Sequence, residues 1–334
     1  MKNFTYYRPK TVQQAIGLLE NKWGSAELLA GGTDLLDLQK EYIAQPDKVI
    51  SVTGIGDLTG CEVEKDSVKI GAAVKLADIA AHAELRKLFP SLTTAAGDIG
   101  GPQIRNMGTL GGNLCQRNRC WYFRDEHVPC LLKGGNKCYA FDGENRYHAI
   151  FTQGHYCVIV SPSTLAPALI ALGASAEVAG PDGKHTVALD KFFQAPRSKE
   201  DREHILAPND VVVSVRIPVS GLANASYEVR HKQAYDWPVA QAAAAFKLEA
   251  GKATNVKIVL GHVAPTPRIA EAAAQVLEGK EISEESAAAA GKAASEGAKP
   301  LAHNGYKIKL VEVAVKRAIL AAAGKKKYWE IQES

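Results

Sequence analysis

The sequence predicts an α+β protein in which a small and a larger α/β unit are followed by a C-terminal α+β domain. Three observations lead to this prediction. Short apolar strands alternate with short helices over residues 1–220, glycine-rich turns interrupt two of these stretches, and the last third places strands before alanine-rich helices. A chain of 334 residues has the length of two or three domains.

Residues 1–57 form the first predicted unit. Thr11 can cap a helix whose apolar face carries Val12, Ala15, Ile16 and Leu19. A short apolar strand then runs into Gly31-Gly32, after which Thr33 and Asp34 open a helix that continues through Leu38.

Residues 58–220 form the second predicted unit. We expect strands at Ser67–Ile70 and Gly71–Val74, helices at Leu76–Leu88 and Thr164–Leu172, a hairpin at Ala176–Val187 and a strand at Asp210–Pro218. Pro181-Asp-Gly183 supplies the turn of the hairpin, because proline and glycine suit tight turns.

Residues 221–334 form the predicted C-terminal domain. We expect strands at Tyr227–Gln233, Ala240–Leu248 and Val256–Val263, then helices at Arg268–Leu277, Glu284–Glu296 and Tyr306–Ala323. The second and third of these strands pair across the turn Glu249-Ala-Gly-Lys252. Alanine-rich runs punctuated by valine and leucine indicate closely packed helices.

Two glycine turns are candidates for binding an anion. Glycine removes the Cβ atom, so the backbone N–H groups around Gly31-Gly32 can approach a phosphate. A plain strand-to-helix turn explains one such motif equally well, and neither G-x-G-x-x-G nor a Walker lysine is present. A second turn, Gly108-Thr-Leu-Gly-Gly-Asn113, has matching chemistry, and the pair suggests a dinucleotide with a central pyrophosphate.

The cysteines are concentrated in one polar loop. Five of the six lie within residues 115–157, and the loop also carries Arg119, Arg124 and Asp125. The length of the chain argues against a small disulfide framework, and paired C-x2-C zinc knuckles are missing. The polar neighbours argue against buried thiols that act only as small apolar side chains. Open spacing favours an iron–sulfur cluster, and structural zinc is the alternative.

The ligand set for such a metal site is drawn from these five cysteines. Cys120, Cys130, Cys138 and Cys157 give the spacing C-x9-C-x7-C-x18-C. Cys115 directly follows the second glycine turn and could replace Cys120. The loop histidines, His127, His148 and His155, are further candidate ligands, although we expect them at the surface.

Composition and missing motifs exclude several classes of function. A formal net charge of +4 without a basic cluster does not indicate a nucleic-acid partner, and no apolar run has the length of a membrane span. No secretory signal, GxSxG or HExxH motif is visible. We therefore expect a relay protein whose redox chemistry comes from its cofactors.

Five motifs, in this order, resemble the FAD-binding subunit of the xanthine dehydrogenase (molybdenum hydroxylase) family. They are Ala30-Gly-Gly-Thr-Asp34, Gly71-Ala-Ala-Val74, Gln103-Ile-Arg-Asn106, Thr109-Leu-Gly-Gly-Asn113 and Gly261-His-Val-Ala-Pro-Thr-Pro267. The resemblance covers essentially the whole chain. It implies a first FAD-binding subdomain at 1–57, a second at 58–220 and a flavoprotein C-terminal domain at 221–334.

About forty extra residues separate the second glycine turn from Ser161-Pro162. This insertion, 115–157, is similar to the subset of the family that carries a [4Fe–4S] cluster, and Gln116–Asp125 is most similar to the periplasmic aldehyde oxidoreductase version. The resemblance implies Cys120, Cys130, Cys138 and Cys157 as the cluster ligands.

The resemblance also implies which residues hold FAD. They are Leu29, Ala30, Gly31, Gly32, Thr33, Asp34, Leu35, Gly108, Thr109, Gly111, Gly112, Asn113 and Lys232. The family often has aspartate a few residues after Ser-Pro, where this chain has Thr164. We therefore assign that contact to Asp125.

The implied function is electron transfer. Electrons from oxidation of an aldehyde or similar substrate would leave a molybdopterin-binding large subunit, cross a small [2Fe–2S] subunit and reach FAD and an external acceptor. A 4-hydroxybenzoyl-CoA reductase-like subunit would run the electrons toward molybdenum. A zinc-stapled nucleotide-binding regulator is the alternative from another class. We expect the cytoplasm, or the periplasm after co-export with a signal-bearing partner.

Overall fold

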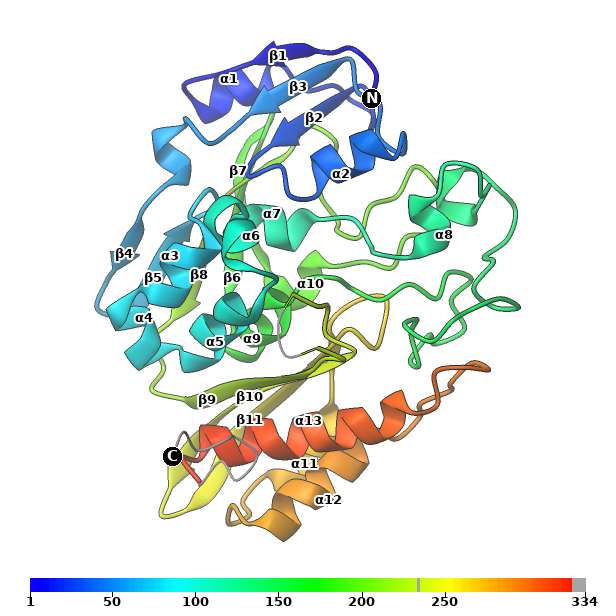
Figure 1. Ribbon diagram of the computed structural model, residues 1–334. Coiled ribbons are helices and arrows are strands. Elements are labelled where there is room, and N and C mark those ends of the chain that lie inside the picture. Colours follow the sequence, from blue (N-terminus) through cyan, green and yellow to red (C-terminus); the bar gives the residue numbers. More distant parts are fainter. Residues whose placement is uncertain (233–234, 326–334) are drawn as a thin grey trace.

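The computed structural model describes residues 1–232 and 235–325, and in that part of the chain the strands form three sheets (Figure 1). The predicted α+β class is confirmed. None of the helices within these residues is both long and apolar enough to span a membrane.

The first sheet is small and parallel. Its order is β1-β3-β2, with β1 at Thr5–Tyr7, β2 at Ala26–Leu29 and β3 at Lys48–Ser51. Helices α1 (Val12–Ile16) and α2 (Leu35–Lys40) connect these strands. The predicted cap is confirmed, because the Thr11 hydroxyl accepts a hydrogen bond from the Gln14 N–H.

The second sheet is antiparallel and has the order β4-β5-β8-β6-β7. The strands are β4 (Cys61–Val63), β5 (Ser67–Gly71), β6 (Ser175–Gly180), β7 (Gly183–Ala188) and β8 (Val211–Pro218). The predicted hairpin is β6–β7. The predicted strand Gly71–Val74 is wrong beyond Gly71, because the chain turns there into the next helix.

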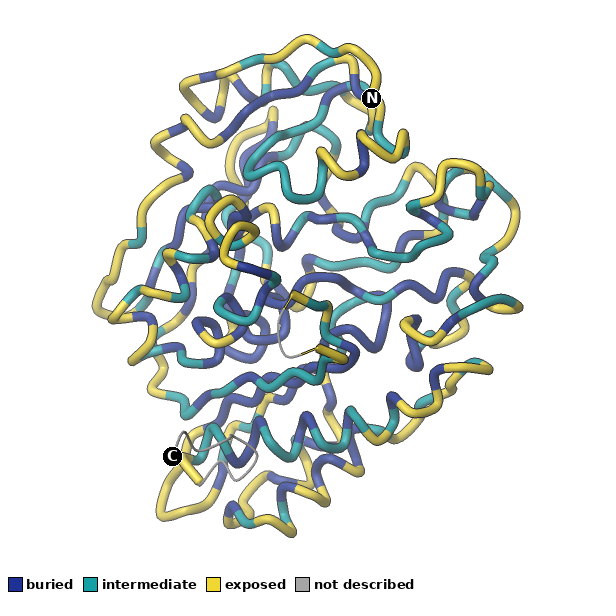
Figure 2. Tube along the Cα trace, in the orientation of Figure 1, coloured by how far each residue is buried: buried dark blue, intermediate teal, exposed yellow. Residues whose placement is uncertain are grey.

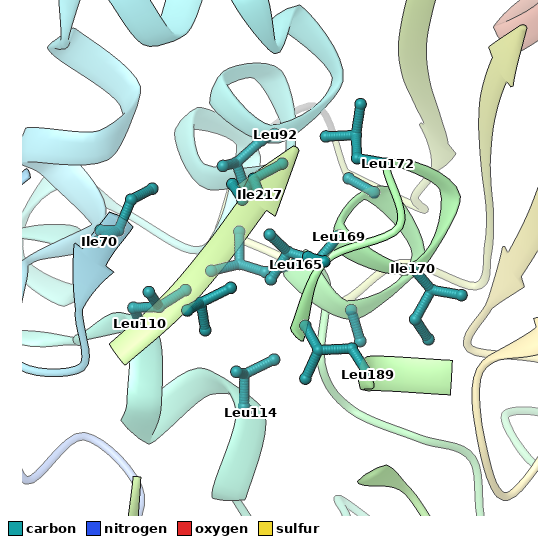
Figure 3. Packing of buried hydrophobic residues seen from close by; sticks show 14 of the residues in the cluster. Ile70, Leu92, Leu110, Leu114, Leu165, Leu169, Ile170, Leu172, Leu189 and Ile217 are labelled. Atoms are coloured by element: carbon teal, nitrogen blue, oxygen red, sulfur yellow. The ribbon is translucent and has the colours of Figure 1, made fainter. Parts of the chain in front are cut away.

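Short helices cover the second sheet. They are α3 (Leu76–Ala81), α4 (Ala83–Leu88), α5 (Pro90–Asp98), α6 (Pro102–Met107), α7 (Leu110–Cys115), α9 (Leu165–Ala171) and α10 (Leu189–Phe192). The single helix predicted at Leu76–Leu88 is two helices, because the extended backbone of His82 ends α3 and its ring caps α4. Figure 3 shows the apolar core formed between these helices and the sheet.

The third sheet has the order β12-β11-β10-β9. The strands are β9 (Ala223–Val229), β10 (Ala240–Glu249), β11 (Lys252–Gly261) and β12 (Arg268–Ile269). The predicted pairing of β10 with β11 is confirmed. Several boundaries were wrong. The strand β9 begins and ends about four residues before the predicted strand, and β11 begins at Lys252 rather than Val256 and ends at Gly261 rather than Val263. Arg268 lies in β12 rather than in the following helix. Gln233, the predicted end of β9, lies outside the described residues.

Helices pack on both faces of this sheet. Below it in Figure 1 lie α11 (Glu271–Leu277), α12 (Glu284–Ala294) and α13 (Lys307–Ala322), and above it lie α5 and α9. Residues Ala240–Phe246 of β10 are therefore all buried, whereas the tip of the β10–β11 hairpin is exposed (Figure 2). Small alanine side chains suit a strand that is covered on both sides.

The cysteine-rich segment between α7 and α9 is mostly irregular. It contains one short helix, α8 (Trp121–Arg124), and one 3-10 turn, η2 (Leu131–Lys133). A second 3-10 turn, η1 (Gly56–Leu58), lies between β3 and β4. The loop extends to the side of the molecule, from α8 beside α2 toward the start of α13 (Figure 1).

The contact between α12 and α13 gives a stability prediction. A Cβ atom added at Gly291 would overlap the Glu312 carbonyl oxygen of α13. We expect Gly291→Ala to lower the free energy of unfolding by about 1–3 kcal/mol, because overpacking outweighs the better helix propensity of alanine. Denaturant unfolding measures this change. Gly54→Ala, where no heavy atom lies within 4 Å, is the control and should change little; equal effects would contradict the close contact.

Candidate cofactor site

The two glycine turns lie against each other although 76 residues of sequence (positions 32–107) separate Gly31 from Gly108. A Cβ atom at Gly31 would overlap the carbonyl of Met107, directly before Gly108. The Gly108 carbonyl in turn accepts a hydrogen bond from the Leu76 N–H at 2.9 Å. The structure therefore brings Leu29–Leu35 and Gly108–Asn113 together, and only glycine at position 31 permits this approach.

The first turn presents unused backbone donors. Among the described residues, no acceptor takes the N–H groups of Gly31, Gly32, Thr33 or Asp34. Gly32 has φ +75°, in the left-handed region. Successive free N–H groups in such a turn form a concave site for an anion.

The second turn uses its own donors. The Leu110 N–H donates to the Val74 carbonyl at 2.9 Å and the Gly111 N–H to the Ala72 carbonyl at 2.8 Å. The Thr109 hydroxyl accepts from the Gly112 N–H and caps α7. This turn is fixed by the chain that follows β5, so it shapes the site without offering these amides to a ligand.

The Asn113 side chain also faces the protein. Its Oδ1 accepts a hydrogen bond from the Ser163 hydroxyl at 2.8 Å and one from the Leu165 N–H at 3.3 Å. Asn113 thus ties α7 to the start of α9, just after the Ser161-Pro162 segment.

Asp34 joins the first glycine turn to the cysteine loop. Its carboxylate accepts from the Arg117 N–H at 2.9 Å and from Arg124 Nη2 at 2.6 Å, and it pairs with Arg119 Nη1 at 3.1 Å. The Asp34 side chain is only 17% exposed. Burial lowers the pKa of Arg119 to about 10, partly offset by the charge of Asp34. Asp37 lies on the outer side of the same two arginines.

Glu203 anchors the loop from the opposite side. Its buried carboxylate accepts from Arg117 Nε at 2.7 Å and from the Asn118 N–H and Nδ2 at 3.1 and 2.7 Å. Burial alone would raise the pKa of Glu203, but the charge of Arg117 and the two donors of Asn118 lower it below 4.5. Asn118 also accepts from the Cys120 N–H, which fixes the first cysteine of the pocket described next.

Four cysteines line one small pocket in this loop. They are Cys120, Cys130, Cys138 and Cys157, and the remaining walls include Phe123, Leu132, Tyr139 and Ile159. Two of the sulfurs interact directly, because a hydrogen bond between Cys157 and Cys138 lowers the pKa of Cys138 and raises that of Cys157. The free volume is about 10 Å³, roughly the room for one water.

Backbone amides surround these sulfurs. The amides of Tyr122 and Phe123 favour the Cys120 thiolate, and those of Leu132 and Lys133 favour that of Cys130. Ala140, Phe141 and Val158 do the same for Cys138, and Ile159 does it for Cys157. Burial still raises the pKa of Cys120, to about 12. This donor set suits ligated thiolates.

The geometry separates these cysteines from the other two. Cys115 ends α7 and packs against the main core, where burial raises its pKa to about 12. Cys61 lies in β4.

In the part of the chain that the structure describes, no group of three or more His, Cys, Asp or Glu side chains is arranged to hold a metal ion.

Two predicted cofactor residues, Asp125 and Lys232, do not take part in the contact between the two glycine turns. Asp125 is exposed at the end of α8, where its carboxylate accepts from the His127 N–H. Lys232 is exposed in the loop after β9, not on a strand, and its N–H donates to Asp236. In the same loop, Trp237 stacks on the Arg119 guanidinium at 4.5 Å, so that loop reaches the Asp34 network.

The histidines of the loop divide into two kinds. His127 is exposed and His155 half-buried, but the prediction of a surface position is wrong for His148, which is buried with its Nε2 at 3.2 Å from Cys120 Sγ.

Sequence reasoning also missed the partners of the loop arginines. The run Gln116–Asp125 alternates arginine with polar residues, which signals nearby carboxylates, but the sequence does not say that they are Asp34 and Glu203.

Known proteins resemble this chain over nearly its full length. The family described as FAD binding domain in molybdopterin dehydrogenase matches residues 2–220, and the CO dehydrogenase flavoprotein C-terminal domain matches residues 225–322. The aldehyde oxidoreductase FAD-binding subunit PaoB of Escherichia coli (strain K12) is 36% identical over 286 residues, 84% of this chain and 87% of PaoB. The carbon monoxide dehydrogenase medium chain of Hydrogenophaga pseudoflava is 30% identical over 96% of each chain.

Solved structures give the same result. Carbon monoxide dehydrogenase from Hydrogenophaga pseudoflava matches with a TM-score of 0.76 and 29% identity, over 96% of this chain and 98% of that one. The cyanide-inactivated Cu,Mo-CO dehydrogenase matches with a TM-score of 0.77 and 26% identity, over 98% and 100%.

The fold and the paired glycine turns therefore define a flavoprotein component of an oxidoreductase. The chain belongs to the FAD-binding medium subunits of the xanthine dehydrogenase/CO dehydrogenase family, as its motifs predicted. It is an FAD-binding subunit of a molybdenum hydroxylase-type complex. This membership argues against the alternative of a regulator without a redox role.

The Glu203 anchor gives a prediction about stability and pH. Glu203→Gln leaves Arg117 partly buried without its charge partner, so we expect a loss of about 3 kcal/mol at pH 7. Because the folded-state pKa of Glu203 is depressed, its contribution is present above its unfolded pKa and disappears as the pH falls through the folded value. The difference between wild type and variant should therefore shrink below pH 4.5.

Thermal or urea unfolding between neutral and acidic pH measures this difference. Glu200→Gln, an exposed neighbour, is the control and should behave as wild type. A pH-independent difference for Glu203→Gln would contradict the role of its charge.

Proposed function

We propose that this chain is the FAD- and [4Fe–4S]-carrying electron-transfer subunit of a heteromeric molybdenum hydroxylase. The observation that carries the proposal is the placement of Cys120, Cys130, Cys138 and Cys157 around one pocket in a loop that Asp34 ties to the first glycine turn. Four thiols arriving from separate stretches of chain match the ligand requirement of a cuboidal cluster.

The FAD site is proposed at the two glycine turns. The free N–H groups of Gly31, Gly32, Thr33 and Asp34 would bind the pyrophosphate, with Leu29, Ala30 and Leu35 flanking them. Gly108, Thr109, Gly111, Gly112 and Asn113 would form the facing wall. Lys232 would extend toward the flavin from the loop after β9. Bound FAD supplies reversible transfer of one or two electrons between the partner centres and an acceptor.

The sequence spacing supports a cluster in preference to zinc, because the paired C-x2-C knuckles typical of structural zinc are missing. A [4Fe–4S] cluster takes one thiolate at each of four irons, so its ligands are spread more widely. The pocket of about 10 Å³ is smaller than a cluster, so binding requires the Cys138 and Cys157 sulfurs to separate.

The proposed partners are a molybdopterin-binding large subunit and a small [2Fe–2S] subunit. Oxidation of an aldehyde or similar substrate at molybdenum would supply electrons that leave through this chain to an external acceptor. PaoB, a subunit of an aldehyde oxidoreductase, favours this direction. The alternative, a 4-hydroxybenzoyl-CoA reductase-like subunit, runs the same relay toward molybdenum.

The same proposal divides the chain at residues 57 and 220 into two FAD-binding subdomains and a C-terminal flavoprotein domain. The Asp125 carboxylate accepts a hydrogen bond from the His127 N–H of its own loop, and this contact does not support the predicted role of Asp125 at the flavin. The cytoplasmic location stays a prediction, as does its alternative of co-export to the periplasm.

Serine variants test the cluster. We expect Cys120→Ser, Cys130→Ser, Cys138→Ser and Cys157→Ser each to lose most of the iron and acid-labile sulfide of anaerobically purified protein, because each removes one thiolate of the pocket. Cys115→Ser and Cys61→Ser are matched controls and should keep wild-type iron. Flavin content reports that the variants fold.

Two results would contradict the proposal. Loss of iron in Cys115→Ser with retention in Cys120→Ser would replace the ligand set. Wild-type protein with flavin, one zinc and no iron would make the loop a zinc site.

Asp34 is predicted to support both cofactor sites. Asp34→Asn removes the charge that Arg119 and Arg124 share, so we expect flavin and iron contents to fall together. Asp37→Asn is the control, because Asp37 contacts the same arginines from an exposed position. Flavin and iron are measured per chain after anaerobic purification. Unchanged contents in Asp34→Asn would contradict the coupling.

A further inference from the structure

His148 is the only histidine in the described part of the chain whose ring lies within hydrogen-bond distance of a cysteine sulfur. It lies in the cysteine loop and is 4% exposed, and its Nε2 is 3.2 Å from Cys120 Sγ, within hydrogen-bond distance for sulfur. Its Nδ1 is buried and has no hydrogen-bond partner. The ring therefore presents one nitrogen to the proposed cluster pocket.

The position of the ring is fixed from several sides. Trp121 packs edge-on against it with ring centres 5.5 Å apart, and Tyr122 lies at 6.2 Å. The carbonyl of His148 accepts from Lys307 Nζ at 3.1 Å and from Asn304 Nδ2 at 3.2 Å. Lys307 is itself buried at the start of α13, so the C-terminal helix layer holds the backbone of His148 in place.

The chemistry of the contact follows from the state of the sulfur. A thiol can donate its proton to an imidazole nitrogen, but a cysteine bound to iron is a thiolate and can only accept. The nitrogen that faces it must then carry the proton. The Asn145 backbone carbonyl is a competing acceptor for a ring proton, but Nδ1 makes no hydrogen bond to it, so the proton can reside on Nε2.

We propose that His148 is a positioning residue that donates an Nε2–H···Sγ hydrogen bond to the Cys120 ligand and raises the reduction potential of the cluster. This inference rests on the proposed function. Reduction adds negative charge to a cluster and its thiolates, and an N–H donor stabilises the more negative state.

Replacement of the ring tests the hydrogen bond. Redox titration of anaerobic protein, followed by EPR, gives the midpoint potential of the cluster. In His148→Leu the ratio of reduced to oxidised cluster at a fixed potential should fall about tenfold, equivalent to about 59 mV for one electron. His148→Gln keeps an N–H donor and should recover most of this difference. The exposed His127→Leu is the control from the same loop and should match wild type.

Wild-type protein labelled with [15N]histidine provides a second test that does not depend on the folding of a variant. Pulsed EPR of the reduced protein should detect a weak histidine-nitrogen coupling, of the size expected through a hydrogen bond. A strong coupling would mean that His148 binds iron directly, and no coupling would mean that the contact is absent; both overturn the inference.

The outcomes separate the inference from the proposed function. A wild-type cluster whose potential is unchanged in His148→Leu overturns the role of His148 and leaves the cluster standing. Wild-type protein that contains flavin but no iron overturns the proposed cluster and this inference with it.

Discussion

The carboxylate of Asp34 is the interaction on which the arrangement of the site depends. It lies in the first glycine turn, yet its hydrogen bonds and ion pairs reach the backbone of Arg117 and the guanidinium groups of Arg119 and Arg124 in the cysteine loop. The loop has almost no regular secondary structure of its own, so its position relative to the turn is set by such side-chain contacts. Glu203 supplies the matching anchor on the other side.

The glycine turns and the cysteine pocket are therefore held in place by different kinds of interaction. The glycine turns are positioned by backbone: Gly31 lies against Met107, and the amides of the second turn are bonded to the strand-to-helix segment after β5. The cysteine pocket is positioned by buried and half-buried charges and by aromatic contacts. A site held by backbone tolerates changes of side chain, whereas a site held by ion pairs responds to the loss of a single charge.

The sequence was sufficient for the parts of the fold that depend on local pattern. The Thr11 cap, the β6–β7 hairpin and the β10–β11 pair follow from capping, turn and alternation signals, and they are present. His82 was missed as a break, because nothing in the apolar spacing of Leu76–Leu88 marks it. The end of β9 was misplaced because no glycine or proline directly after Val229 marks the end of the strand.

Tertiary contacts within the site were beyond reach of the sequence. The clustering of five cysteines was visible, and the structure brings together the four that the motif resemblance selected while Cys115 packs into the core. The partners of the loop arginines lie about 80–90 residues away on either side, and His148 reaches Cys120 across 28 residues of irregular chain. No periodicity links such positions, so only the folded chain reveals them.

The most direct measurement is native mass spectrometry of anaerobically purified protein, which weighs both cofactors on the same molecule. We expect one chain with one FAD and a further mass equal to four iron and four sulfide ions. A chain that carries FAD and a single zinc ion, or FAD without metal, would contradict the central claim that the cysteine loop is an iron–sulfur site.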